Sequence, residues 1–108
     1  MDAKQYILKE LSSLVAKFSN IRVRYEYDER AEVHCVEVVP KEVYYSNDAY
    51  ISWEIDVTSR FIKHFPTENI GFISDDDLMG IENAAYVSAG KNYAPAHRKA
   101  KAQTMEYA

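Results

Sequence analysis

The densest acidic stretch of the chain is the run of three aspartates at 75–77, which could bind Mg²⁺ or Ca²⁺ through carboxylate oxygens. A calcium loop places a glycine at its sixth position and a glutamate at its twelfth. Counted from the first aspartate, Gly80 fits the sixth position, but Tyr86 occupies the twelfth. Ser74 and Asp77 instead have the spacing of a capping box at a helix start. We therefore predict a short helical turn here, and neither a metal nor another cofactor.

His34 and Cys35 are neighbours and could act as base and nucleophile. In a strand, however, adjacent side chains project to opposite faces, so the imidazole of His34 cannot activate the thiol of Cys35. The other two histidines are His64, at the end of a predicted helix, and His97, in the C-terminal tail. The three glycines form no phosphate-binding motif. We expect structural roles for these side chains, no catalytic residues and therefore no enzyme.

Charge is divided unevenly along the chain. Residues 1–90 carry nine basic and sixteen acidic side chains, whereas residues 91–108 carry four basic and one acidic. An acidic body does not attract phosphate over long distances. The basic tail could still contact nucleic acid through four side chains, Lys91, Arg98, Lys99 and Lys101. Since a solvated, alanine-rich helix explains the same basic run, nucleic-acid binding is kept as an alternative.

Tyrosine is abundant, with nine of 108 residues against four phenylalanines and one tryptophan. Tyr44 and Tyr45 are consecutive, so at most one of the two can point into the core. Exposed tyrosine is enriched where proteins contact proteins, because the ring adds contact area at low entropic cost. The rings could instead only cover the margin of a small core. The candidate partner-binding residues are Tyr44, Tyr45, Arg22 and Arg24, and we expect a protein partner or a homodimer.

Size and composition are typical of one small globular domain. The chain has 108 residues, of which 47% are hydrophobic, and no stretch approaches the roughly 20 apolar residues that span a bilayer. The single cysteine, Cys35, cannot form an intramolecular disulfide, which favours a reducing compartment. We therefore expect a cytoplasmic protein without a membrane segment.

Hydrophobic spacing predicts a helix followed by a hairpin. Residues 3–18 carry apolar side chains at helical spacing. Residues 21–27 alternate between apolar and polar, and a second strand follows at about 31–39. If opposed apolar positions share a face, paired residue numbers sum to 59, which places Arg22 opposite Glu37.

A second helix and a third strand complete the predicted core. Pro40 should end the second strand, and residues 41–46 are ambiguous between an extended connection and a helical turn. The next helix starts near Asn47 or Asp48 and is closed by Pro66. Three isoleucines widen its apolar stripe, Ile51, Ile55 and Ile62. Residues 70–73 are predicted to form a short strand.

The element order is thus α-β-β-α-β-(α), an α+β fold of two layers. We predict a three-stranded, mostly antiparallel sheet with strand order 2-1-3 and both long helices on one face. The opposite face, with Arg22, Arg24 and Glu26, would be open to water or a partner, and the second strand would form an edge. Residues 1–81 would hold the core, and residues 82–108 would form a basic, alanine-rich, partly helical appendage.

Three segments, at 25–28, 37–40 and 65–76, resemble small uncharacterised bacterial domains of unknown function. The resemblance covers about residues 5–80 and consists of packing and turn residues, so it implies a bacterial, mobile-element or phage-associated accessory protein but no activity. The functional hypothesis is a non-enzymatic protein-interaction module of the antitoxin, immunity or inhibitor kind. The alternative is a nucleic-acid-associated protein that uses the basic tail.

Overall fold

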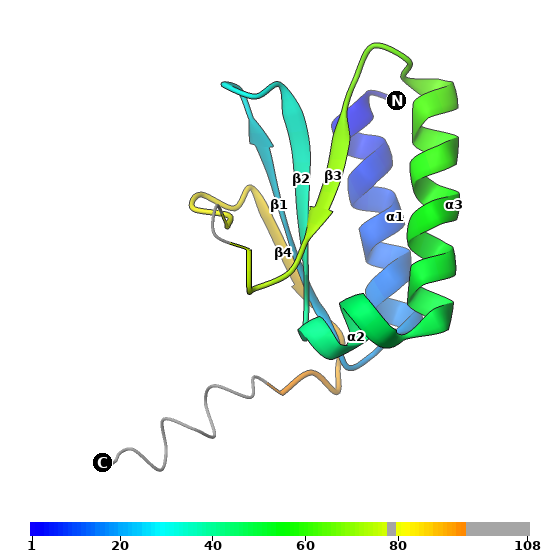
Figure 1. The fold of residues 1–108 in the computed structure, drawn as a ribbon, viewed down its shortest axis with the longest axis vertical. Helices are drawn as coiled ribbons and strands as arrows, with labels where there is room; N and C mark the ends of the chain where they lie inside the picture. Colours follow the sequence, from blue (N-terminus) through cyan, green and yellow to red (C-terminus); the bar gives the residue numbers. More distant parts are fainter. Residues whose placement is uncertain (78–79, 95–108) are drawn as a thin grey trace.

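A four-stranded mixed sheet lies against two long helices in the computed structural model, which describes residues 1–77 and 80–94 (Figure 1). The α+β class and the placement of both long helices on one side of the sheet agree with the prediction. The elements are α1 (Ala3–Lys17), β1 (Arg22–Asp28), β2 (Val33–Val39), α2 (Lys41–Ser46), α3 (Asp48–His64), β3 (Ile70–Ile73) and β4 (Tyr86–Ala89).

Helix α1 begins with a complete capping box. The Asp2 carboxylate accepts a hydrogen bond from the Gln5 amide at 2.8 Å, and the Gln5 side chain accepts one from the Asp2 amide at 3.1 Å. These bonds satisfy amides that have no partner within the helix. The helix buries one stripe against the sheet, Ala3, Ile7, Leu11 and Leu14. The predicted helix at 3–18 is confirmed to within one residue.

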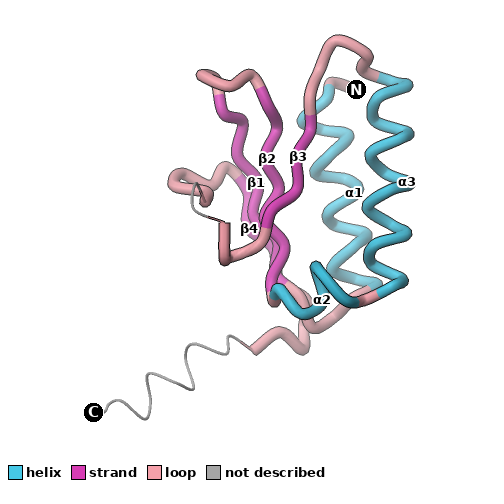
Figure 2. The backbone as a smooth tube through the Cα atoms, viewed as in Figure 1, coloured by secondary structure: helices cyan, strands magenta, loops and turns pink. Residues whose placement is uncertain are grey.

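The region after Pro40 resolves the ambiguity left by the sequence, because residues 41–46 form the short helix α2 (Figure 2). Helix α3 then starts where Asn47 accepts a hydrogen bond from the Tyr50 amide at 2.9 Å. The prediction assigned too many isoleucines to the apolar, core-facing side of α3. Ile55 is 66% exposed and Ile62 is 55% exposed, because the core-facing side of the helix is formed by Tyr50, Val57 and Phe61.

The β1–β2 hairpin has the predicted faces but not the predicted register. Its paired residues run from Arg22 with Val39 to Asp28 with Val33, two positions away from the expected pairing. The hairpin turn sets this register: Asp28 accepts hydrogen bonds from the amides of Arg30 and Ala31 at 3.0 and 3.1 Å. A shift of two residues keeps every side chain on its face, so the hydrophobic pattern could not detect it.

The predicted strand order 2-1-3 was wrong, because the sheet has the order β3-β2-β1-β4. Strand β3 pairs parallel with β2, so β2 is a central strand rather than an edge. The place expected for β3, beside β1, is taken by β4, which pairs antiparallel with β1. The prediction assigned residues 86–89 to the tail because that region has few large apolar side chains. Of the partly helical appendage predicted at 82–108, residues 95–108 lie outside the described residues.

The inner face of the sheet packs against α1 and α3 and carries a buried polar chain. The Tyr25 hydroxyl lies 2.7 Å from Nδ1 of His34, and Nε2 of His34 lies 2.7 Å from the Glu68 carboxylate. His34 is only 5% exposed. Burial, with smaller contributions from nearby negative charges, raises the pKa of Tyr25 to about 12, so the tyrosine stays neutral and can donate to His34.

Gly90 follows β4 and fixes it against the turn after α1. Its amide donates to the Ile21 carbonyl at 2.8 Å, and a Cβ at this position would overlap the backbone carbonyl of Ser19. We expect Gly90→Ala to lower the free energy of unfolding by about 1–3 kcal/mol, because the overlap is with backbone that cannot rotate away. Urea denaturation measures the change.

Gly71→Ala is the matched control for Gly90→Ala. A Cβ at Gly71 would meet only the Val33 side chain at an ordinary distance of 3.8 Å. We therefore expect a change below about 1 kcal/mol at this site. Equal destabilisation by the two variants would contradict the docking of β4 through Gly90.

Candidate functional site

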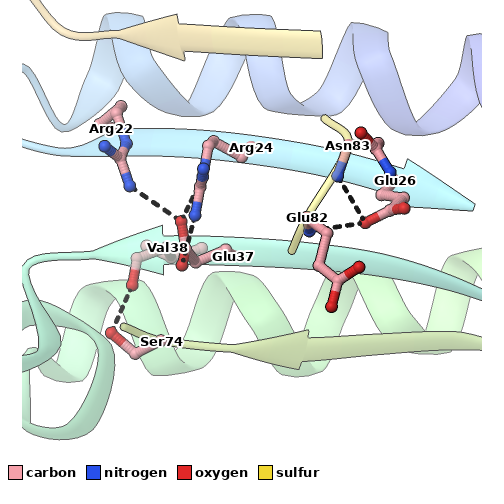
Figure 3. A network of polar contacts seen from close by, with 8 residues as sticks. All are labelled: Arg22, Arg24, Glu26, Glu37, Val38, Ser74, Glu82 and Asn83. Atoms are coloured by element: carbon pink, nitrogen blue, oxygen red, sulfur yellow. Dashed lines mark hydrogen bonds and ion pairs between the residues drawn. The ribbon is translucent and has the colours of Figure 1, made fainter. Parts of the chain in front are cut away.

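The face of the sheet that points away from α1 and α3, here called the outer face, gathers the charged side chains of the strands (Figure 3). Alternation along β1 and β2 places Arg22, Arg24 and Glu37 on this face, as the sequence pattern predicted. Because Cα partners share a face, a row of side chains crosses all four strands, formed by Ile73, Glu37, Arg24 and Val87.

Glu37 is the centre of this face and is only 3% exposed. Arg22 Nη2 lies 2.8 Å from its Oε1, Arg24 Nε lies 2.7 Å from the same oxygen, and Arg24 Nη2 lies 3.1 Å from Oε2. The sequence predicted Arg22 opposite Glu37, which was wrong because Arg22 lies opposite Val39, although the side chains of Arg22 and Glu37 do form an ion pair. It missed the direct Cα pairing of Glu37 with Arg24, because the register is shifted by two residues.

This network controls the charge state of Glu37. Burial works to raise the pKa of Glu37, but hydrogen bonds from Arg24 and the positive charges of Arg24 and Arg22 outweigh it, so the pKa is lowered. The hydrogen bond to Glu37 also raises the pKa of Arg24, despite its desolvation. Arg22 and Arg24, two candidate partner-binding residues, therefore direct their charges at Glu37, with side chains 24% and 30% exposed.

The loop between β3 and β4 crosses the outer face, so this face is not as open as predicted (Figure 2). At its start, the Ser74 hydroxyl donates to the Val38 carbonyl at 2.7 Å. Further along, the Glu26 carboxylate lies 3.2 Å from the Glu82 amide and 3.5 Å from the Asn83 amide. The capping box expected at Ser74 was wrong, because the Ser74 side chain bonds β2 and the Asp77 amide donates to the main-chain carbonyl of Ser74 at 3.2 Å. Asp75 and Asp76 form a turn, and the helical turn predicted beyond them includes residues 78–79, which lie outside the described residues.

A hollow of about 400 Å³ lies between this loop and the hairpin. We call it the acidic hollow, because the described residues that line it include five carboxylates and one arginine. These residues are Glu26, Asp28, Glu29, Asp77 and Glu82, with Arg30, and the remaining lining residues are Tyr27, Cys35, Ile73 and Gly80. Like charges that share a concave, partly desolvated surface create a focused negative potential.

Cys35 lines the acidic hollow, on the face opposite to His34. Burial raises the pKa of the Cys35 thiol, and the nearby carboxylates of Asp28, Glu26 and Asp77 raise it further. The thiol is therefore protonated at neutral pH and is a poor nucleophile. His34 bonds Tyr25 and Glu68 on the inner face, so the structure separates the two residues as the sequence predicted.

The two consecutive tyrosines lie on α2 and have different environments. Tyr44 is half-buried and its hydroxyl donates to the Phe72 carbonyl of β3 at 2.6 Å. Tyr45 is 57% exposed, and its hydroxyl lies 3.1 Å from the Asp76 carboxylate. One ring therefore points inward and one outward, as expected. Of these two tyrosines, Tyr45 is the one whose ring is exposed.

The structure describes only one of the candidate nucleic-acid contacts. Lys91 is exposed just after β4, whereas His97 and the other three basic residues lie outside the described residues, namely Arg98, Lys99 and Lys101. The acidic hollow was not predicted as a site. Its carboxylates lie between positions 26 and 82 of the sequence. Apart from Asp77, which belongs to the aspartate run at 75–77, the signal for them was the acidic balance of residues 1–90.

Removing the charge of Glu37 tests the network. We expect Glu37→Gln to lower the free energy of unfolding by about 2–3 kcal/mol, because two arginines lose their anion. This loss of unfolding free energy is smaller than the loss expected for a fully buried ion pair, because both arginine side chains are partly exposed to water. Glu10→Gln is the control, since it breaks the more exposed Glu10–Arg60 pair and should cost about 1 kcal/mol or less. If Glu37→Gln and Glu10→Gln lower the free energy of unfolding equally, the network around Glu37 does not stabilise the fold more than an exposed ion pair does.

The lowered pKa of Glu37 predicts a pH dependence. The folded state binds a proton less readily than the unfolded chain, in which the pKa has its ordinary value of 4.5. The ionised network is thus fully stabilising above about pH 4.5 and loses this stabilisation as the pH falls through the lower, folded-state pKa. We expect the stability difference between wild type and Glu37→Gln to shrink below pH 4.5 in urea denaturation series. A constant difference from pH 7 to pH 3 would contradict this assignment.

Comparisons of the chain with protein-family models, curated proteins and solved structures found no match. Among residues 1–77 and 80–94, no helix has the length and apolar character needed to cross a membrane. The same described residues contain no group of three or more histidine, cysteine or acidic side chains arranged to hold a metal ion.

Proposed function

We propose that this protein is a non-enzymatic interaction module of the antitoxin, immunity or inhibitor kind, which binds a basic surface of a protein partner through the acidic hollow. The observation that carries the proposal is the gathering of five carboxylates around one concavity of about 400 Å³. Such a surface attracts lysine and arginine side chains and accelerates their encounter with the module.

Hydrogen bonds to backbone amides hold the described parts of both walls of the hollow in place. Glu26 anchors the loop that forms one wall of the hollow, through the amides of Glu82 and Asn83. Asp28 shapes the hairpin on the other side by accepting the amides of Arg30 and Ala31. A pre-organised site loses little conformational freedom when a partner binds. We propose that Tyr45, exposed on α2, adds aromatic contact area outside the hollow.

A nucleic-acid partner is less well supported by the described residues. Arg22 and Arg24 are engaged with Glu37, so their charges are not offered to phosphate. The alternative depends on the basic run after residue 90 and stays a prediction. We further propose a cytoplasmic location, because the one cysteine, Cys35, is a free thiol.

Model peptides test the charge preference of the hollow. We expect a pentalysine peptide to shift the NMR amide resonances of Glu29, Cys35 and Gly80 at low salt, and pentaglutamate to leave them unchanged. Screening should abolish the shifts at about 0.5 M salt. The double variant Glu29→Lys/Glu82→Lys should weaken pentalysine binding by tenfold or more, whereas Glu42→Lys, exposed on α2 outside the hollow, should change it less than threefold.

The same variants identify a natural partner. A protein recovered by affinity purification with wild type and with Glu42→Lys, but lost with the hollow variant, is the expected result. The proposal is wrong if pentalysine causes no shifts at low salt, or if the hollow variant and the control bind it equally. Recovery of nucleic acid that depends on residues 91–108 would favour the alternative.

A further inference from the structure

Helix α3 presents a second surface, on the side of the molecule that carries the helices (Figure 1). Ile55 and Ile62 are seven residues apart, so they lie on one face of the helix, two turns from each other. They are 66% and 55% exposed, and the half-buried Ile51 extends the same line by one turn. We call Ile51, Ile55 and Ile62 the isoleucine stripe. Side chains of this kind are the ones a helix normally buries.

The charged residues beside the isoleucine stripe indicate which surface packs against it. Asp56 and Lys63 each follow one of the exposed isoleucines, so they lie on the same flank of α3 and are also seven residues apart. Both are exposed. If a second α3 packs antiparallel about a twofold axis, the Asp56 of each copy lies near the Lys63 of the other. A parallel arrangement would instead place these two flanks on opposite sides of the interface, so the contact between Asp56 and Lys63 could not form.

We infer that the isoleucine stripe is a self-association surface, which packs antiparallel against the stripe of a second copy of this chain. Ile55 of each copy then contacts Ile62 of the other. Asp56 already lies 2.9 Å from the Arg60 guanidinium of its own helix, but a carboxylate has acceptor sites for more than one donor. The helix dipoles, with Asp48 near the N-terminus and Lys63 near the C-terminus, also favour the antiparallel arrangement.

This association goes beyond the proposed function and is compatible with it. The stripe lies in the helical layer, whereas the acidic hollow lies on the outer face of the sheet. A dimer through α3 therefore leaves both hollows accessible and makes the module bivalent. Because only two largely exposed isoleucines per copy are buried, we expect a weak dimer, with a Kd on the order of 10 µM.

Sedimentation equilibrium of the full chain over a wide concentration range tests the dimer. Ile55→Ser/Ile62→Ser should raise the Kd by tenfold or more without loss of helical circular dichroism, because neither side chain packs in the core. Val87→Ser is the matched control, since Val87 is also 56% exposed but lies on β4. It should leave the Kd within threefold of wild type.

Charge reversal tests the antiparallel geometry. Asp56→Lys alone and Lys63→Asp alone should each weaken the homodimer, because each places two like-charged contacts across the twofold axis. A mixture of the two variants should form heterodimers that neither forms alone, since both contacts then join opposite charges. A wild type that is monomeric at about 1 mM, a dimer that is unaffected by the stripe variant, or a mixture without heterodimers would overturn the inference. These results are independent of pentalysine binding.

Discussion

The outer face of this protein depends on one nearly buried carboxylate. Glu37 sits on the side of the sheet without helices, where a charge would ordinarily be solvated, yet it is 3% exposed. A desolvated carboxylate is tolerated only with good partners, and Arg22 and Arg24 provide three hydrogen bonds within 3.1 Å. These bonds fix two positions of β1 against β2, and so they fix the strands on which the hairpin side of the acidic hollow is built.

The two faces of the sheet give neighbouring residues of β2 different environments. His34 and Cys35 are adjacent in β2, but His34 joins a hydrogen-bonded chain in the core, whereas Cys35 lines the hollow among carboxylates. Negative charge around the hollow stabilises the neutral thiol, so the same field that would attract a cation also suppresses thiolate chemistry. The Cys35 thiol is thus poorly suited to nucleophilic attack.

Much of the local structure was predictable, because it depends on neighbours in the sequence. The capping box at Asp2, the start of α3 after Asn47, and the faces of the hairpin all follow from spacing over a few residues. Strand β4 was not predictable in this way. It is four residues long and is held by pairing with β1 and by the fit of Gly90 against Ser19, neither of which leaves a periodic signal.

The sequence by itself determined the fold class, the two long helices, three of the strands and the inward and outward faces of the hairpin, because hydrophobic period and capping are local properties. Tertiary structure alone decided the register, the strand order and the exposure of Ile55 and Ile62. It also decided the acidic hollow, whose carboxylates come from the hairpin and from the loop before β4. Such a site exists only once β4 pairs with β1 and the preceding loop folds back over Glu26.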